Sequence, residues 1–275
     1  MIPTMNDRVV MVLCDGLGDG PAGDRMGYLE HLVEEKAASR YTSRAVLPTM
    51  SRPNYESLHT GVGPRQHGLV SNHTVQESTM PNVFALARAA GLTTAAVAYY
   101  WFSELYHRSP YDRVDHAEYD DGDAGITYGR FYQANDQPDS EVIVRAVMLA
   151  RRYAPSYILA HPMGIDHAGH TSGRDSAQYN QAVSDLDGML AMAIPAWLDL
   201  GYSVLVTSDH GHDEHKYHGG TVDEVRNVPV YTIRPSGTGR GRQDAMLSHL
   251  QVAPTLCRAL GVEPAATMQA QSFEW

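Results

Sequence analysis

The fold is decided by residues 202–211, which read YSVLVTSDHG. Residues 202–207 form a short, largely apolar run, and Asp209 and His210 follow it almost at once. A run of this length and composition predicts a buried β-strand. Its carboxyl end therefore carries a carboxylate and an imidazole.

The same pattern occurs at two earlier places in the chain. Residues 8–14 (RVVMVLC) lead directly to Asp15, and residues 157–160 (YILA) come shortly before Asp166. In open α/β sheets the ligand crevice lies outside the carboxyl ends of the strands. We therefore expect Asp15, Asp166 and Asp209 to meet at one edge of a sheet.

Strand and helix patterns alternate along the rest of the chain. The sequence predicts helices over residues 28–39, 81–91, 140–153, 175–198 and 246–260, and further strands over residues 93–99 and 228–233. Such alternation predicts an α/β fold with a mainly parallel central sheet and helices on both faces. We expect a single domain over residues 1–275, with strand 228–233 at a sheet edge because it contains Pro229.

Residues 102–138 break this alternation. The segment is rich in Tyr, Asp and Gly, and long irregular stretches of this kind are often lids or substrate loops. A surface excursion packed by its own aromatic side chains is the alternative interpretation.

Composition limits the classes of partner and compartment. A formal net charge of −11 disfavours binding to nucleic-acid polymers. No apolar run approaches the length of about 18 residues that would cross a membrane, and residues 1–7 lack the features of a signal peptide. With only two cysteines, the sequence predicts a cytoplasmic protein without membrane contact, and it gives no indication of oligomeric state.

The polar residues after the predicted strands suit a divalent metal ion. Asp166 and His170 are four residues apart, so one helical turn would place both on the same face. His218, followed by two glycines, could return to the same ion. Asp and His together favour zinc, manganese or iron. The alternative for each Asp is helix capping, and His167, His212 and His215 are expected to be solvated.

Taken in order, the motifs resemble those of the alkaline phosphatase superfamily, and most closely the type I phosphodiesterase/nucleotide pyrophosphatase family. The resemblance spans nearly the whole chain and rests on Asp15-Gly16, residues 47–61 (LPTMSRPNYESLHTG), residues 68–72 (GLVSN), Asp166 with His170, Asp209-His210-Gly211, His218-Gly219-Gly220 and residues 249–262.

This resemblance implies a site with two divalent ions, most commonly zinc. One ion would be held by Asp166, His170 and His218. The other would be held by Asp15, Asp209, His210 and the side-chain oxygen of Ser51.

The resemblance also assigns Ser51 as the nucleophile and Asn72 as a residue that holds the phosphate. A serine hydroxyl is a weak nucleophile until a metal or a base activates it. Two metals can stabilise the attacking and leaving oxygens of an in-line displacement. The implied activity is hydrolysis of a small phosphodiester or pyrophosphate through a covalent intermediate on Ser51.

Arg52 departs from the pattern, because an aromatic residue follows the nucleophile in nucleotide-specific relatives. A guanidinium could stack on a base or pair with a doubly charged phosphate. Arg52 is therefore a candidate substrate-binding residue, and it opens the alternative of a phosphomonoesterase or phosphonate (phosphonoacetate-type) hydrolase. A phosphomutase would need a large inserted cap, for which this chain has little room. A non-catalytic metal-binding protein is the alternative from another class.

Overall fold

The computed structural model describes residues 8–275, so the prediction about a signal peptide in residues 1–7 lies outside the described residues. The strands of the described part are β1 (Arg8–Leu13), β2 (Ala38–Arg44), β3 (Thr94–Tyr99), β4 (Glu118–Tyr119), β5 (Tyr128–Tyr132), β6 (Tyr157–Ala160), β7 (Tyr202–Thr207), β8 (Asn227–Ile233) and β9 (Gly241–Ser248). The helices are α1 (Asp19–Arg25), α2 (Gly27–Glu34), α3 (Ser51–Thr60), α4 (Pro64–His67), α5 (Val83–Ala89), α6 (Trp101–Tyr106), α7 (Asp139–Tyr153), α8 (Gly164–Ser172), α9 (Ala177–Asp199), α10 (Asp223–Arg226) and α11 (Val252–Ala259), with the 3₁₀ turn η1 (His249–Gln251).

The strands form one sheet in the order β4-β5-β3-β6-β1-β7-β8-β2-β9. The centre of the sheet is parallel: β1 lies between β6 and β7, so that Val10 pairs with Ile158 on one side and with Val204 on the other. Antiparallel pairs occur between β7 and β8, β8 and β2, and β5 and β4. The predicted mainly parallel α/β sheet is confirmed.

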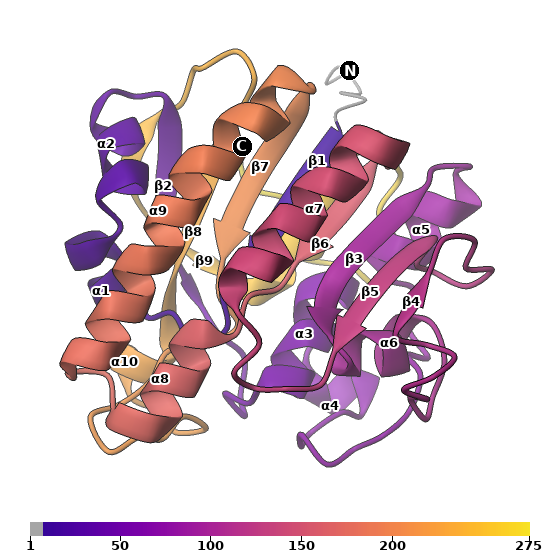
Figure 1. Cartoon of the computed structure of the whole chain (residues 1–275), viewed down its shortest axis with the longest axis horizontal. Coiled ribbons are helices and arrows are strands. Elements are labelled where there is room, and N and C mark those ends of the chain that lie inside the picture. Colours follow the sequence, from indigo (N-terminus) through magenta and orange to yellow (C-terminus); the bar gives the residue numbers. More distant parts are fainter. Residues whose placement is uncertain (1–7) are drawn as a thin grey trace.

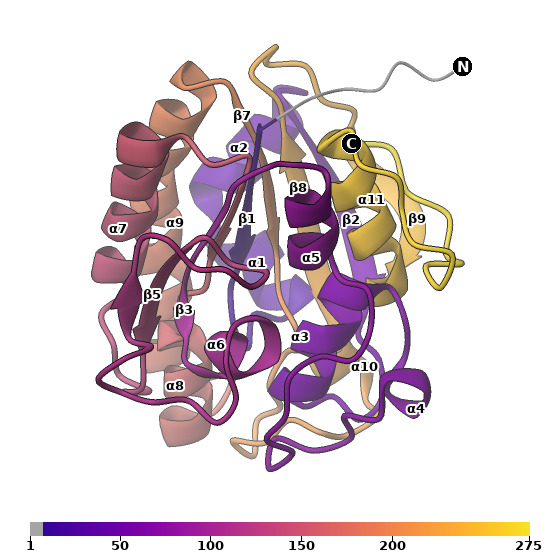
Figure 2. The same cartoon turned by 90° about the vertical axis from the view of Figure 1, so that its right-hand side faces the viewer.

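Helices cover both faces of the sheet, as predicted. Helices α7 and α9 lie on one face, and α3, α5 and α11 lie on the other (Figures 1 and 2). Alternate residues of the central strands point into two separate cores: Val10 and Val12 belong to the core beneath α9, and Met11 and Leu13 to the core beneath α3. No helix within residues 8–275 is long and apolar enough to cross a membrane.

The prediction that residues 228–233 form an edge strand is wrong. Strand β8 lies between β7 and β2, and β9 is the edge strand on that side. Pro229 pairs with Thr42 of β2. The last residue pair between β8 and β7 joins Val230 to Thr207, so Pro229 lies one residue outside the β7 pairing. A proline is tolerated at this position because it replaces no residue paired with β7. Two segments predicted to be helical partly belong to strands. Strand β2 begins within the last residues of the segment 28–39, and strand β9 ends within the first residues of the segment 246–260.

Residues 102–138 contain more regular structure than the sequence predicted. They include most of α6 and the whole of β4 and β5, and β5 extends the sheet by pairing in parallel with β3. The irregular part is therefore confined to the connections on either side of β4 and to residues 133–138 after β5. Arg130 of β5 pairs with Glu118 of β4 and with Asp120 in the connection between these strands.

Helix α3 is buried along its whole length although its sequence, SRPNYESLHT, is mainly polar. Polar partners from other elements satisfy it: Asn54 bonds Val46 and His249, Glu56 bonds Ser78 and Tyr106, and Ser57 bonds His67. Buried polar groups without such partners would destabilise the fold. Ser51, the first residue of α3, is therefore held in place by this network.

Glu56 gives a test of the network. Burial raises the pKa of Glu56 from its ordinary 4.5 to about 7, so the folded protein retains a proton that the unfolded chain loses. The free energy of unfolding should therefore fall between about pH 4.5 and 7. In Glu56→Gln this contribution is absent, and the stability of the variant relative to wild type should rise across that window by up to about 3 kcal/mol. Urea unfolding at several pH values measures the difference.

The exposed Glu34→Gln is the matched control and should follow the wild-type pH dependence. A difference between Glu56→Gln and wild type that does not change with pH would contradict the burial argument.

Candidate metal and catalytic centre

The carboxyl ends of β6, β1 and β7 bring Asp166, Asp15 and Asp209 to one edge of the sheet. All three side chains are buried. Gly16 allows the close approach: it has a φ of +77°, and a Cβ there would lie 2.8 Å from Cα of Asp166. Its N–H donates to Oδ1 of Asp209 at 3.2 Å, which joins the ends of β1 and β7.

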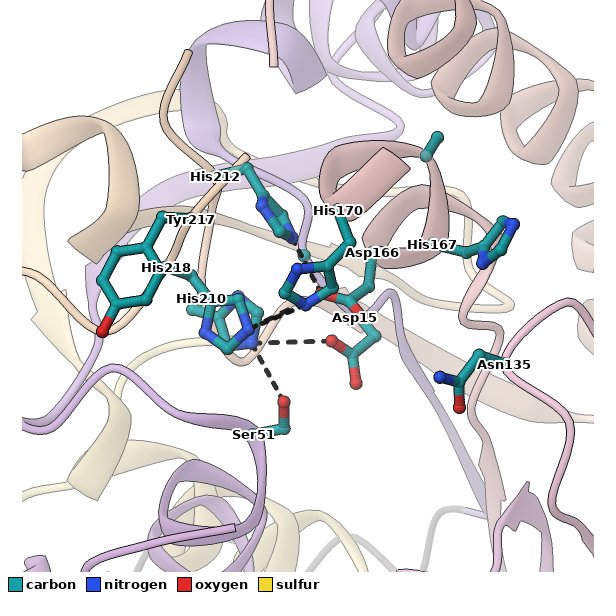
Figure 3. A network of polar contacts seen from close by, with 12 residues as sticks. Asp15, Ser51, Asn135, Asp166, His167, His170, His210, His212, Tyr217 and His218 are labelled. Atoms are coloured by element: carbon teal, nitrogen blue, oxygen red, sulfur yellow. Dashed lines mark hydrogen bonds and ion pairs between the residues drawn. The ribbon is translucent and has the colours of Figure 1, made fainter. Parts of the chain in front are cut away.

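One group of possible metal ligands lies around Asp166. It consists of Asp166, His170, His212 and His218, whose ligand atoms all lie within 4.8 Å of one another. Asp166 and His170 share a face of α8, as their spacing predicted, with 3.5 Å between Oδ1 and Nε2. Nε2 of His218 lies 3.1 Å from Nε2 of His170 (Figure 3).

A second group lies around His210. Its Nε2 is 3.6 Å from Oδ1 of Asp15, 3.2 Å from Oδ2 of Asp209 and 3.1 Å from Oγ of Ser51. Asp15, Asp166 and His210 also offer ligand atoms within 4.8 Å of one another, so Asp166 is within reach of both groups. The seven residues predicted as metal ligands are thus brought together in space: Asp15, Ser51, Asp166, His170, Asp209, His210 and His218.

Backbone carbonyls fix how two of the imidazoles face the site. Nδ1 of His218 donates to the carbonyl of Thr49 at 2.9 Å, and Nδ1 of His210 donates to the carbonyl of Gly211 at 3.2 Å. With the proton on Nδ1, Nε2 of each ring carries the lone pair that a metal binds. Burial also lowers the pKa of both rings, which favours the neutral form.

The surroundings raise the pKa of two of the three carboxylates and lower that of the third. Burial, and then the charge of Asp15, raise the pKa of Asp166 to about 7. Burial, with Asp15 and Asp166, raises the pKa of Asp209 well above its usual range. Burial would also raise the pKa of Asp15, but hydrogen bonds from His161 and Tyr55 outweigh it and lower that pKa.

The residues present fit divalent cations. Oδ1 of Asp15 and Oδ2 of Asp209 are buried, and neither has a hydrogen-bond partner among the described residues. Buried carboxylate oxygens normally have a partner, and a cation would both supply one and offset the repulsion among the three carboxylates. The donor set of carboxylates and imidazoles suits zinc, and also manganese or iron.

Ser51 and Asn72 lie next to each other at the start of α3. Oδ1 of Asn72 accepts the N–H of Arg52 at 3.0 Å. Because the carbonyl oxygen of Asn72 is used in this way, its NH₂ group is the part left to donate to a ligand. The N-terminus of a helix also favours an anion such as phosphate.

Arg52 does not lie free for a substrate. Its Nη2 is 2.7 Å from Oε2 of Glu104, its guanidinium lies 4.6 Å from the ring centre of Trp101, and the side chain is buried. Its Nε and Nη1 have no hydrogen-bond partner among the described residues, so substrate binding by Arg52 stays a prediction.

Sequence reasoning missed three residues that contact the predicted metal ligands. His212, predicted to be solvated, is buried with Nε2 at 2.8 Å from Oδ1 of Asp166. His161 and Tyr55 both contact Oδ2 of Asp15. The backbone N–H of Tyr99 donates to Nδ1 of His161, so this nitrogen carries no proton. Nε2 of His161 is therefore the nitrogen that donates to Asp15. The sequence offered a signal for two of them: His161 directly follows β6, and His212 lies two residues after the predicted ligand His210.

The fold and the gathering of Asp, His and Ser side chains at the strand ends agree with the predicted resemblance to the alkaline phosphatase superfamily. Residues 9–230 match the family model described as type I phosphodiesterase/nucleotide pyrophosphatase. The chain belongs to this family.

Similar proteins agree with this assignment. The catalytic subunit of human GPI ethanolamine phosphate transferase 2 is 28% identical over 94% of this chain and 27% of its own length. A 2,3-bisphosphoglycerate-independent phosphoglycerate mutase of Syntrophotalea carbinolica is 33% identical over 39% of this chain and 21% of its own length. The chain thus spans about a quarter of these relatives.

Among solved structures, an inactive variant of murine ectonucleotide pyrophosphatase/phosphodiesterase 5 in complex with AMP has the same fold. It superposes with a TM-score of 0.75 at 13% identity, and the match covers 94% of this chain and 96% of that one.

Metal binding should stabilise the protein measurably. Zinc at about 1,000 times its dissociation constant should raise the free energy of unfolding by about 4 kcal/mol relative to chelator-treated protein. Asp209→Asn should bind less zinc and gain less stability, because a buried ligand charge is lost. Metal analysis and thermal unfolding measure both effects. Glu214→Gln, exposed in the same loop, should behave as wild type; full zinc content in Asp209→Asn would refute the assigned ligand.

Proposed function

We propose that this protein is a metal-dependent hydrolase of small phosphodiesters or pyrophosphates, with Ser51 as the nucleophile. The observation that supports this most is the position of Ser51. Its Oγ lies at the start of α3, 3.1 Å from Nε2 of His210, and that nitrogen lies 3.2 Å from Oδ2 of Asp209 and 3.6 Å from Oδ1 of Asp15. A hydroxyl that faces predicted metal ligands in this way suits nucleophilic attack.

Ser51 would carry the phosphoryl group between two steps. Its hydroxyl proton passes to solvent, Oγ bonds to phosphorus, and the bond to the leaving oxygen breaks as that oxygen takes up a proton from solvent. A diester substrate keeps its other ester group on the phosphate carried by Ser51. Water then cleaves the phosphoseryl ester and restores the hydroxyl. Two divalent ions, zinc by preference, would supply charge neutralisation and lower the pKa of the hydroxyl when bound.

The chain's own groups would position the phosphate. The NH₂ group of Asn72 and the backbone N–H of Ser51 would donate to a non-bridging oxygen, and the N-terminus of α3 favours the negative charge. His218 and His210, oriented by backbone carbonyls, would keep their ligand nitrogens fixed throughout the reaction.

The partners of Arg52 support a diester rather than a monoester. A phosphate monoester carries a second charge that a free guanidinium would neutralise, but Glu104 already pairs with Arg52. Glu104 also accepts the N–H of Tyr111, and Tyr111 packs on Tyr100 at 5.3 Å between ring centres. We infer that Tyr100 and Tyr111, the second of which lies within residues 102–138, border the substrate.

A second candidate is transfer of the phosphoryl group to an alcohol instead of water. The similarity to the GPI ethanolamine phosphate transferase along 94% of this chain favours it. Both reactions would share the intermediate on Ser51 and differ only in what attacks it. Adding a primary alcohol to the assay and quantifying the phosphorylated alcohol against free phosphate product separates the two.

Ser51→Ala should reduce turnover roughly 10³-fold or more while zinc remains bound. The assay compares bis-p-nitrophenyl phosphate with p-nitrophenyl phosphate on zinc- and manganese-loaded protein, and we expect the diester to be the better substrate. Mass spectrometry of quenched wild-type reactions should find the phosphoryl adduct on the peptide with Ser51.

Ser236→Ala, at an exposed serine whose hydroxyl bonds Thr238, is the control and should keep wild-type activity. Full activity in Ser51→Ala would refute the mechanism. A preference for the monoester would favour the phosphomonoesterase alternative.

A further inference from the structure

We propose that His212 is a fourth protein ligand of the ion held by Asp166, His170 and His218. Neither the family resemblance nor the sequence pattern assigns it this role. The inference rests on the proposed metal-dependent function, and it specifies how one of the two ions is held.

His212 is placed as a ligand would be. The side chain is fully buried, and its Nε2 lies 2.8 Å from Oδ1 of Asp166. Its ring centre is 4.8 Å from that of His170 and 5.1 Å from that of His218, and both rings meet it edge-on. Figure 3 shows the three rings and Asp166 turned toward a common point.

Four of the six spacings among the ligand atoms lie around the tetrahedral value, and all six are within 4.8 Å. Zinc bonds to nitrogen and oxygen of about 2.1 Å place tetrahedral ligand atoms about 3.4 Å apart. The distances here are 2.8 Å from Asp166 to His212, 3.1 Å from His170 to His218, 3.5 Å from Asp166 to His170 and 4.0 Å from Asp166 to His218. These values lie on both sides of the tetrahedral one.

The fold makes room for this imidazole. A Cβ at Gly169, on α8 between the two ligands of that helix, would lie 2.5 Å from the ring of His212. Only glycine at that position lets the ring reach Asp166. Helix α8 thus contributes two ligands and also the space for a third from the loop after β7.

Four protein ligands would make this ion a closed site. Structural zinc sites are filled by four protein ligands, whereas catalytic ones keep an open position. An ion held by Asp166, His170 and His218 alone would keep one coordination position open. Binding of His212 in that position should therefore raise the affinity of this site for its ion.

The alternative role for His212 is a hydrogen bond to Asp166 without contact to the ion. Glutamine separates the two roles, since its NH₂ group can donate to Asp166 but its amide is a poor ligand for zinc. In His212→Gln we expect zinc affinity at one of the two sites to fall at least 10-fold in a chelator competition. The cobalt-loaded variant should lose the intense visible bands of a four-coordinate site. His215→Gln, exposed three residues later in the same loop, is the matched control.

A second measurement needs no variant. Wild-type protein loaded with ¹¹³Cd and labelled with ¹⁵N should show three imidazole nitrogens coupled to one cadmium and one imidazole to the other. Coupling of only two imidazoles to the first cadmium, with His212 uncoupled, would overturn the inference even if His212→Gln did not fold.

The outcomes distinguish this inference from the proposed function. Wild-type affinity and an unchanged cobalt spectrum in His212→Gln would overturn the role of His212 alone. A wild-type protein that binds no divalent ion would overturn the proposed function together with it.

Discussion

Three buried carboxylates at the ends of adjacent parallel strands are the constraint on which the rest of this structure depends. Asp15, Asp166 and Asp209 lie where β1, β6 and β7 end, with almost no access to water. Their repulsion would be costly in a low-dielectric environment. Divalent cations bound between them would offset this repulsion. The arrangement of these three carboxylates therefore suits the binding of divalent cations.

The carboxylates are not equivalent, because their neighbours differ. Asp15 receives hydrogen bonds from His161 and Tyr55 on one oxygen, which leaves the other oxygen free toward the site. Asp166 instead faces three imidazoles and has a pKa raised to about 7. One carboxylate is thus kept ionised by the protein, and the other depends on a bound cation for its charge. Both residues follow a parallel strand, so their place in the sheet does not explain the difference in pKa. The hydrogen bonds from His161 and Tyr55 to Asp15 do explain it.

Helix α3 supplies the other half of the centre. It is polar and fully buried, so each of its polar side chains needs a partner from another element. These partners hold Ser51 against His210, and α6 holds Arg52 through Glu104 and Trp101. The positions of Ser51 and Arg52 are therefore both consequences of burying one polar helix.

The sequence by itself determined the central strands and the residues at their ends, because apolar runs and the polar groups that follow them are local features. It also predicted the shared face of Asp166 and His170, since helical periodicity places them together. Only the tertiary structure decided which other residues join them. His212 meets Asp166 across 46 positions and Arg52 meets Glu104 across 52, and the interior place of β8 depends on pairing with the unpredicted strand β2. Burial of a histidine or an arginine depends on packing between distant segments, and no local pattern records it.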